Sequence, residues 1–328
     1  MDLIENILET NIIPTVEKPP SQNTSNSSPI FARHETFHPR YGWLKKGFDV
    51  VLKDPEIFNK ESAPADFGVG KNMVRAVRYW CSAFKILKEI RKSGQKGFSY
   101  IPSKLGFNLL KNDGWDPFLE DPASLWLLHW NLIKPPSLAT AWYFTFNHFH
   151  QGIFTAEDLL RALKDLKSKF FPTNNIIDAS LNKDIHCLLR MYVTPHDLKS
   201  LKEDSLDCPF SDLGILKHNG DSKHFSFNIG NKLGLPAEII VVACLEYISS
   251  LERGAKTISI ARLLYEPGSP GLVFKLSESS LFNAIESVSS KNKDLFLSET
   301  AGLIQFSFAK DPILLAESIL NNYYKKRK

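Results

Sequence analysis

The chain of 328 residues has a mass of 37.2 kDa, and 43% of its residues are hydrophobic and 23% charged. This composition fits a globular protein of two or three domains and excludes a largely disordered chain, a fibrous repeat and a coiled coil. No apolar run approaches the roughly 18 residues that a membrane helix needs, and the acidic N-terminus is not a secretory signal, so we expect a cytoplasmic protein without a membrane partner.

The net charge of +4 is unevenly distributed along the chain. Residues 31–112 contain 16 Lys and Arg against 7 Asp and Glu, whereas the rest of the chain is acidic overall. A basic N-terminal third is typical of a protein that binds a polyanion such as DNA, although the basic part could instead pack on the acidic part. The four cysteines form no CxxC pair, which argues against a zinc ribbon and favours reduced, buried thiols.

The first ordered domain is expected after a disordered leader of residues 1–30, whose second half is rich in Pro, Ser and Asn. Residues 63–80 read as a short helix, a sharp turn at Gly68 and a second helix, because glycine readily takes the positive φ that such a turn needs. Residues 96–110 follow as a strand or hairpin and a helix start, which is the order of a winged helix. We therefore predict a basic winged-helix DNA-binding domain over residues 31–112.

The second helix of this helix-turn-helix carries most of the residues expected to bind DNA. Its start and outer face present polar and basic side chains where such motifs contact the duplex. The predicted DNA-binding residues are Arg40, Lys71, Asn72, Arg75 and Arg78. Pro64 and Arg78 depart from the usual helix-turn-helix pattern, so a helical hairpin with a solvated basic face is the alternative.

Residues 113–200 are predicted to form an aromatic-rich helical domain. Four of the six tryptophans lie between residues 115 and 142, and Pro122 opens a helix that is apolar over a wide arc and is therefore buried. Aromatic side chains can stack unpaired bases, but these come without interleaved Lys or Arg, so a core that joins domains is the better interpretation. A further helix is predicted over residues 155–167, capped by Thr155.

Residues 201–328 are predicted to form a C-terminal winged-helix-like domain. A hairpin is expected to turn at Asn219 and Gly220, and an apolar helix is expected over residues 236–249. Short helices and a second hairpin over residues 295–308 repeat the order of a winged helix. The fold class expected for the whole chain is mainly α with small β-hairpins (α+β), with an N-terminal winged helix-turn-helix, a helical middle and this C-terminal domain.

The segment from His34 to His38 matches the zinc-protease motif H-E-x-x-H. That chemistry requires both histidines on one helical turn, but Pro39 disfavours helical geometry at His38 and no third ligand follows at a suitable spacing, so we expect no zinc. A histidine beside a carboxylate can instead act as a general base or hold part of a divalent metal site. His34, Glu35 and His38 are therefore the candidate catalytic residues. The alternative is a hydrogen-bonded loop that anchors the N-terminal helix.

A second acidic cluster supplies candidate metal ligands, namely Asp113, Asp116 and Glu120. Carboxylate oxygens suit Mg²⁺ or Mn²⁺, the cofactors that phosphodiester cleavage usually uses. The alternative is turn chemistry and helix capping, since Asp-Gly and Asp-Pro are turn pairs. The sequence from Gly68 to Lys71 lacks the rest of a phosphate loop, so nucleotide hydrolysis is not expected.

Several blocks of the sequence, from about residue 31 to the C-terminus, resemble a family of bacterial proteins with a domain of unknown function. These blocks are Phe31–Lys46, Gly68–Val74, Arg78–Trp80, Asp116–Asp121, Leu125–Trp130, Ala139–Phe144 and Ser269–Gly271. The family is encoded beside sulfur-transfer genes whose products replace a non-bridging phosphate oxygen of DNA with sulfur. The resemblance implies a DNA-nicking protein of the single-strand phosphorothioation system that acts with a cysteine desulfurase, an ATPase and a sulfurtransferase. It assigns no catalytic residue.

Two functional hypotheses follow from these observations. The first is a DNA-binding nickase or accessory subunit of a bacterial phosphorothioation defence system, with DNA and the sulfur-transfer and ATPase proteins as partners. In it the basic helix holds the duplex mainly through phosphates, and a metal-activated water near His34 and Glu35 breaks one strand. The second is a non-catalytic winged-helix transcriptional regulator or scaffold subunit, which would bind DNA without cleaving it.

Overall fold

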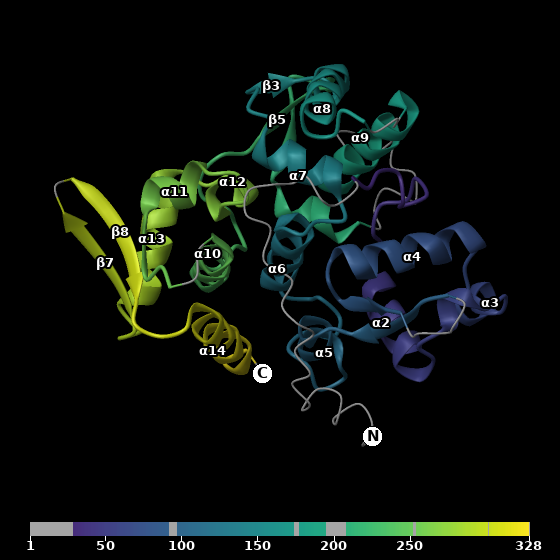
Figure 1. The fold of residues 1–328 in the computed structure, drawn as a ribbon, viewed down its shortest axis with the longest axis horizontal. Helices are drawn as coiled ribbons and strands as arrows, with labels where there is room; N and C mark the ends of the chain where they lie inside the picture. Colours follow the sequence, from purple (N-terminus) through teal and green to yellow (C-terminus); the bar gives the residue numbers. More distant parts are fainter. Residues whose placement is uncertain are drawn as a thin grey trace.

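The computed structural model describes residues 29–91, 97–173, 177–194, 208–251, 254–300 and 302–327. Within them the chain forms helices and three small antiparallel sheets, so the expected α+β class is confirmed (Figure 1). Almost all of the predicted leader lies outside the described residues. In the described part of the chain, no helix is long and apolar enough to cross a membrane.

The N-terminal part of the described chain is a set of helices with one hairpin. Its elements are α2 (Trp43–Lys53), η2 (Ile57–Asn59), α3 (Ala63–Phe67), α4 (Lys71–Ala83), β1 (Leu87–Ile90), β2 (Ser99–Pro102) and α5 (Lys104–Leu110). The two strands pair antiparallel, with Leu87 opposite Pro102. The hairpin therefore begins earlier than the segment in which the sequence predicted it. Helix α4 packs against both α2 and β1.

The middle part combines helices with a three-stranded sheet. Its elements are α6 (Pro122–Ile133), α7 (Thr140–Asn147), β3 (Ile153–Phe154), α8 (Ala156–Phe170), α9 (Asp178–Tyr192), η5 (Pro209–Leu213), β4 (Leu216–Asn219) and β5 (Asp221–Phe227). The strand order is β3-β5-β4, so this sheet joins strands from both sides of the predicted boundary between residues 200 and 201. Thr155 and Asp158 form the capping box of α8.

The C-terminal part also combines helices with a three-stranded sheet. Its elements are α10 (Ala237–Leu251), β6 (Thr257–Ser259), α11 (Ile260–Tyr265), α12 (Pro270–Phe274), α13 (Glu278–Ser289), β7 (Leu295–Thr300), β8 (Leu303–Phe308) and α14 (Pro312–Lys325). The strand order is β6-β8-β7, which leaves β7 at an edge of the sheet. Helix α10 is the centre of this part, since α13 and α14 both pack on it.

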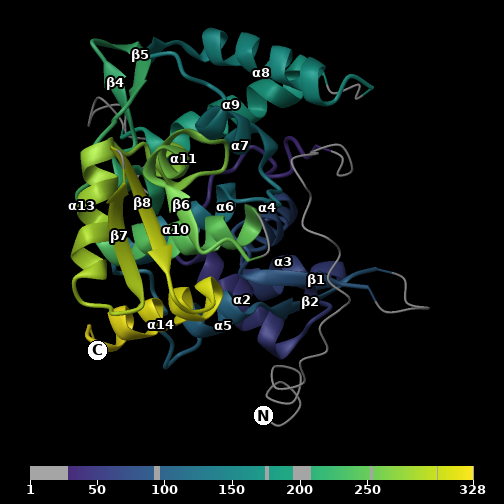
Figure 2. The ribbon, with the colours of Figure 1, turned by 60° about the vertical axis from the view of Figure 1, so that its left-hand side comes forward.

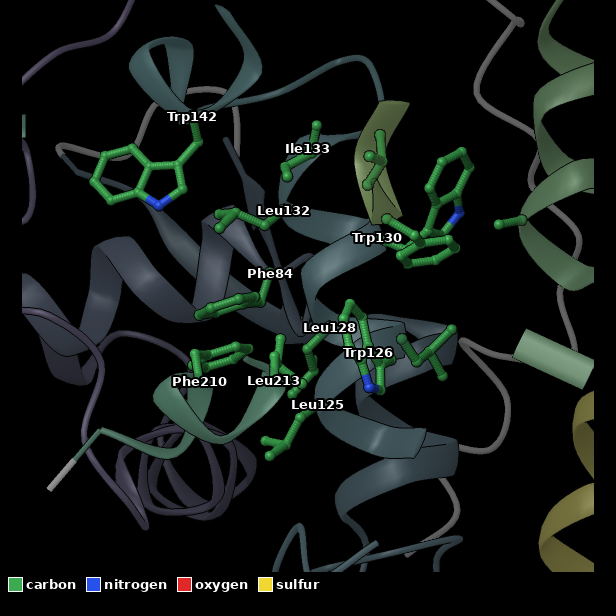
Figure 3. Close-up of a cluster of buried hydrophobic side chains, with 14 of the residues drawn as sticks. Phe84, Leu125, Trp126, Leu128, Trp130, Leu132, Ile133, Trp142, Phe210 and Leu213 are labelled. Carbon is green, nitrogen blue, oxygen red and sulfur yellow. The ribbon is translucent and has the colours of Figure 1, made fainter. Parts of the chain in front are cut away.

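Helix α6 lies at the centre of the molecule, between α4 on one side and α10 and α12 on the other (Figure 1). Every residue of α6 after Pro122 is buried. Figure 3 shows Leu125, Leu128 and Leu132 on the side of α6 that faces Phe84, and Trp126 and Trp130 on the other side. Phe84 stacks on Phe210 at 4.9 Å between ring centroids. Trp126 packs edge-on against Phe274 of α12, so the aromatic residues form a core that joins the parts of the chain, as the sequence predicted.

Candidate functional site

The turn between α3 and α4 has the geometry that the sequence predicted. Gly68 ends α3 with a φ of 59°, in the left-handed region that glycine adopts without strain. Val74 and Val77 are buried and fix the inner face of α4. Consequently Lys71 and Arg75 are on the exposed face of the helix.

A hollow of about 440 Å³ lies where the start of α4 faces the segment that precedes α3. Its walls combine apolar side chains such as Phe58 and Val74 with basic ones. The basic side chains that line it are Lys60, Lys71, Arg75 and Arg78. Three of the five predicted DNA-binding residues therefore share one concave surface, which we call the basic groove. Asn72 is exposed beside it and accepts a hydrogen bond from Arg75.

The basic groove continues toward the β1–β2 hairpin. Arg78 lies next to Tyr100 of β2, whose hydroxyl donates to Glu89 of β1 at 2.9 Å. Burial raises the pKa of Tyr100 to about 12, so the hydroxyl stays protonated and keeps this hydrogen bond at neutral pH. Further along the hairpin, the Arg91 guanidinium lies over the Phe98 ring at 4.8 Å. The contact of Arg78 with Tyr100 therefore joins helix α4 to the hairpin beside the groove.

The segment from His34 to His38 is a tight turn and not a helix. The amide of Phe37 donates to the carbonyl of His34 at 2.9 Å, and both Glu35 (φ 51°) and Thr36 (φ 70°) have left-handed backbone conformations. Non-glycine residues rarely adopt this region, and such residues gather at functional sites. The turn places Glu35 Oε1 3.7 Å from Arg75 Nη1. A candidate catalytic residue is therefore next to a candidate DNA-binding residue.

His34 lies beneath this turn and is completely buried. Its Nε2 donates to Asp184 Oδ1 of α9 at 2.7 Å, and the same oxygen accepts from the amide of Ala32 at 2.9 Å. The imidazole is enclosed by three aromatic rings, stacking on Trp80 and meeting Trp142 edge-on. His34 therefore ties the turn to α9 and does not reach the basic groove.

The His34–Asp184 pair is incompletely satisfied in the described part of the chain. Neither His34 Nδ1 nor Asp184 Oδ2 has a hydrogen-bond partner there, although both atoms are buried. Burial raises the pKa of the Asp184 carboxyl, while the hydrogen bond from His34 acts in the opposite direction. Buried polar atoms without partners are uncommon in folded proteins, and each calls for an explanation such as a functional role.

The remaining residues of this segment have packing contacts. His38 is buried, and its Nε2 lies 3.5 Å from Arg190 Nη2 of α9. The Arg40 guanidinium lies over the rings of Phe37 and Trp43, at 5.9 and 5.6 Å from their centroids. Both histidines are therefore buried and contact side chains of α9. The arrangement agrees with the alternative interpretation of the sequence, a hydrogen-bonded loop that anchors the N-terminal helix.

The acidic cluster before α6 has the hydrogen bonds of a helix-capping turn. Asp116 Oδ1 accepts from the amide of Glu120 at 3.0 Å, and Oδ2 accepts from the amide of Asp121 and the hydroxyl of Ser124. Asp113 is exposed and lies 3.3 Å from the ammonium of Lys111. Among the described residues, no group of three or more His, Cys, Asp or Glu side chains could hold a metal ion. A metal held by the described residues would therefore need further ligands from elsewhere, such as a substrate or water.

Asp184 is the site residue that sequence reasoning missed. It lies on the buried face of α9 together with Leu181, Ile185 and Leu188. A carboxylate within such an apolar stripe is rarely buried unless it is paired. Its position on the helix could have identified Asp184 as the partner of a distant polar group. It could not have identified that group as His34.

The chain is similar to known proteins over nearly its whole length. A family model described as a protein of unknown function (DUF4007) matches residues 31–324. No curated protein matches the chain. An SspB crystal structure is 39% identical, with a TM-score of 0.86 and coverage of 91% of this chain and 88% of that one. A magnesium ion-bound SspB crystal structure is 38% identical, with a TM-score of 0.86 and coverage of 93% and 90%.

Proposed function

Because the chain belongs to the DUF4007 family, we propose that it is the DNA-binding and DNA-nicking component of a bacterial DNA phosphorothioation system. The likeness to SspB supports this proposal, as do the sequence blocks that resemble a family encoded with sulfur-transfer genes. Its partners are then DNA and the sulfur-transfer and ATPase proteins of the same system.

The observation that carries the proposal is the meeting of the basic groove with the turn that holds Glu35. Lys71, Arg75 and Arg78 converge on one concave surface whose positive charge suits a phosphate backbone. Glu35 is 3.7 Å from Arg75 and partly exposed, so a phosphate held by Arg75 lies within reach of its carboxylate. No other candidate catalytic residue has this position, because His34 and His38 are buried.

We assign the three candidate catalytic residues different roles. Glu35 acts directly, as the carboxylate that faces the bound phosphate. His34 is a positioning residue, since its hydrogen bond to Asp184 fixes the turn that presents Glu35. His38 supports the same turn through its contact with Arg190.

Mg²⁺ or Mn²⁺ is the metal that this arrangement suits. Mg²⁺ commonly binds through one or two carboxylates together with substrate phosphates and water, which is compatible with a single exposed glutamate beside a phosphate-binding groove. When bound, the ion would neutralise charge on the phosphate and lower the pKa of a water molecule. The magnesium ion-bound SspB structure supports this choice of metal.

The proposed DNA-binding part is a winged helix, with α3 and α4 as the helix-turn-helix and the β1–β2 hairpin as the wing. We also propose that the C-terminal part is winged-helix-like. Along the chain this part has one strand, then helices and then a hairpin. The three strands form one sheet, in which the last strand, β8, lies between the other two. The middle part has the same strand order, so we place the β4–β5 hairpin with the middle part.

A second candidate function is a DNA-loading or scaffold subunit that binds DNA and cleaves nothing. Two observations favour it: the described residues contain no cluster of metal ligands, and both histidines of the motif are buried.

Plasmid nicking distinguishes the two functions. Purified protein is incubated with supercoiled plasmid in Mg²⁺, Mn²⁺ or EDTA, and conversion to open circle is followed on a gel. The proposal expects metal-dependent nicking that Glu35→Gln abolishes. Glu61→Gln is the matched control, because Glu61 is an exposed carboxylate that lines the same groove. Tight DNA binding with no nicking in any metal would support the scaffold function.

A further inference from the structure

A second groove lies at the opposite end of the molecule, between α13 and the β7–β8 hairpin. It has a volume of about 350 Å³. Its walls are apolar at Phe282, Leu297 and Ile304, and acidic at Glu286 and Glu299. We propose that this acidic groove binds an extended protein segment that carries apolar side chains flanked by Lys or Arg, and that it does not bind DNA.

The two grooves differ in the charge of the helix that lines each of them, α4 in the basic groove and α13 in the acidic groove. Helix α4 has the sequence KNMVRAVRYWCSA, with three basic residues and no acidic one. Helix α13 holds the corresponding place before the C-terminal hairpin and has the sequence ESSLFNAIESVS, with two glutamates and no basic residue. Like charges at an interface repel each other, so the α13 groove disfavours a phosphate backbone and favours a cationic segment.

The two acidic side chains are available to such a segment. Glu286 and Glu299 are exposed, and neither has an ion-pair partner among the described residues. Both line the groove, Glu286 from α13 and Glu299 from β7. The groove therefore offers two negative charges that have no ion-pair partner within the described part of the chain.

The hairpin favours an extended occupant. Strand β7 pairs only with β8 among the described strands, so its outer edge has backbone groups free to pair with another strand. Leu297 and Glu299 are two residues apart on β7, so they share one face of the strand, and both line the groove. Glu299 is opposite Ile304 of β8. A peptide that adds to this edge would place every second side chain in the groove, so the inward positions of the matching segment must carry both apolar and basic side chains.

The positions of the two grooves allow both to be occupied at once. Figures 1 and 2 show the β7–β8 hairpin and α3 at opposite sides of the molecule, with α6 and α10 between them. A partner held on the hairpin would therefore leave the basic groove free. The inference concerns a surface separate from the proposed DNA site and stands whether or not the chain nicks DNA.

Fluorescence anisotropy with labelled synthetic peptides tests the proposal on the full chain. The probe is a peptide of about ten residues in which every second position is Ser and the positions between are, in order, Leu, Lys, Ile, Lys and Leu, so that apolar and basic side chains share one face of the strand. One comparison peptide replaces each Lys by Glu, and the other replaces each Leu and Ile by Ser. We expect saturable binding of the Lys–apolar peptide only, weakened at least about tenfold by Glu286→Lys with Glu299→Lys. Glu278→Lys is the matched control, since Glu278 is on the same helix outside the groove.

Three outcomes would overturn the proposal. The first is peptide binding that the double charge reversal leaves unchanged while thermal unfolding shows the variant to be folded. The second is competition between the peptide and duplex DNA, which would place the peptide in the basic groove. The third is sedimentation showing self-association that the double variant removes, which would make a second copy of the chain the occupant.

Discussion

Arg75 Nη1 lies 3.7 Å from Glu35 Oε1, so an exposed cation of the basic groove is partly neutralised by the neighbouring turn. Exposed pairs of this kind are worth roughly 0.2–1 kcal/mol, which corresponds to a factor of up to about five in affinity. We therefore expect Glu35→Gln to bind duplex DNA up to about fivefold more tightly at low salt, as measured by gel shift. An unchanged or lower affinity would show that Arg75 does not contact the phosphate backbone.

Charge reversal at the same pair has the opposite effect. Arg75→Glu should weaken DNA binding at least about tenfold and lower the slope of log affinity against log salt by about 1, since one phosphate contact is lost. Arg161→Glu is a matched control, because Arg161 is an exposed helical arginine far along the chain on α8. Titrations at several salt concentrations measure both quantities. A slope that stays the same would remove Arg75 from the interface.

The buried pair of His34 and Asp184 predicts a large loss of stability on substitution. His34→Ala opens a cavity among aromatic rings and leaves the Asp184 carboxylate unpaired, and breaking a buried pair costs about 3–5 kcal/mol. Urea unfolding measures this difference. Glu35→Ala on the same turn should change the free energy of unfolding by less than about 1 kcal/mol, since its side chain is partly exposed. A cost below about 1 kcal/mol for His34→Ala would contradict the role of His34 in fixing the turn.

Asp116 should behave as a capping residue and not as a metal ligand. Its carboxylate accepts three hydrogen bonds, two from backbone amides and one from Ser124. Asp116→Ala should therefore lower the free energy of unfolding by about 2–4 kcal/mol. The exposed Asp113 serves as the control, with an expected change for Asp113→Ala within about 0.5 kcal/mol. The Mg²⁺ concentration that gives half-maximal nicking should be the same for both variants, and an increase specific to Asp116→Ala would restore its candidacy as a ligand.

Local sequence signals predicted the elements well because the contacts that decide them are local. Gly68 marked the turn, Pro122 marked the start of α6, and Thr155 with Asp158 marked the start of α8. Each depends on residues no more than a few positions apart. The burial of α6 was also readable, because a helix that is apolar on all sides has no face for solvent.

The candidate site was only partly predictable because its contacts join distant residues. The exposed face of α4 followed from helical period alone. Nothing in the sequence near His34 indicates that its partner lies 150 residues away on α9. Likewise, the pairing of β3 with β5 depends on a strand of two residues, too short for a pattern of alternation to reveal. The motif H-E-x-x-H identified residues that matter for the turn. It did not indicate that His34 and His38 are buried whereas Glu35 is partly exposed, and this difference gives the three residues different roles.

A last prediction concerns acid stability and rests on His129, which is buried at the centre of the molecule on α6. His129 Nε2 donates to the carbonyl of Val273 at 2.9 Å, and Nδ1 accepts from the hydroxyl of Tyr192 at 2.7 Å. This arrangement suits a neutral imidazole. Burial lowers the pKa of His129 from 6.5 to about 4, and the nearby positive charge of Lys275 acts in the same direction.

The sign of the pH dependence follows from these two values. Between pH 6.5 and about 4 the unfolded chain carries a proton on this imidazole that the folded chain does not, so the free energy of unfolding decreases as the pH falls through this range. The full loss is roughly 3 kcal/mol. His148 and His150 have pKa values lowered in the same direction, so the contribution of His129 must be isolated by difference.

The variant His129→Leu provides that difference. It should be less stable than the original chain at pH 7, because the Val273 carbonyl and the Tyr192 hydroxyl lose their partner. Its stability should nevertheless fall less steeply between pH 6.5 and 4, so the two urea-unfolding curves converge as the pH is lowered. Curves that remain parallel over this range would show that His129 is protonated to the same extent in the folded and unfolded chains, and that its hydrogen bonds do not require the neutral form.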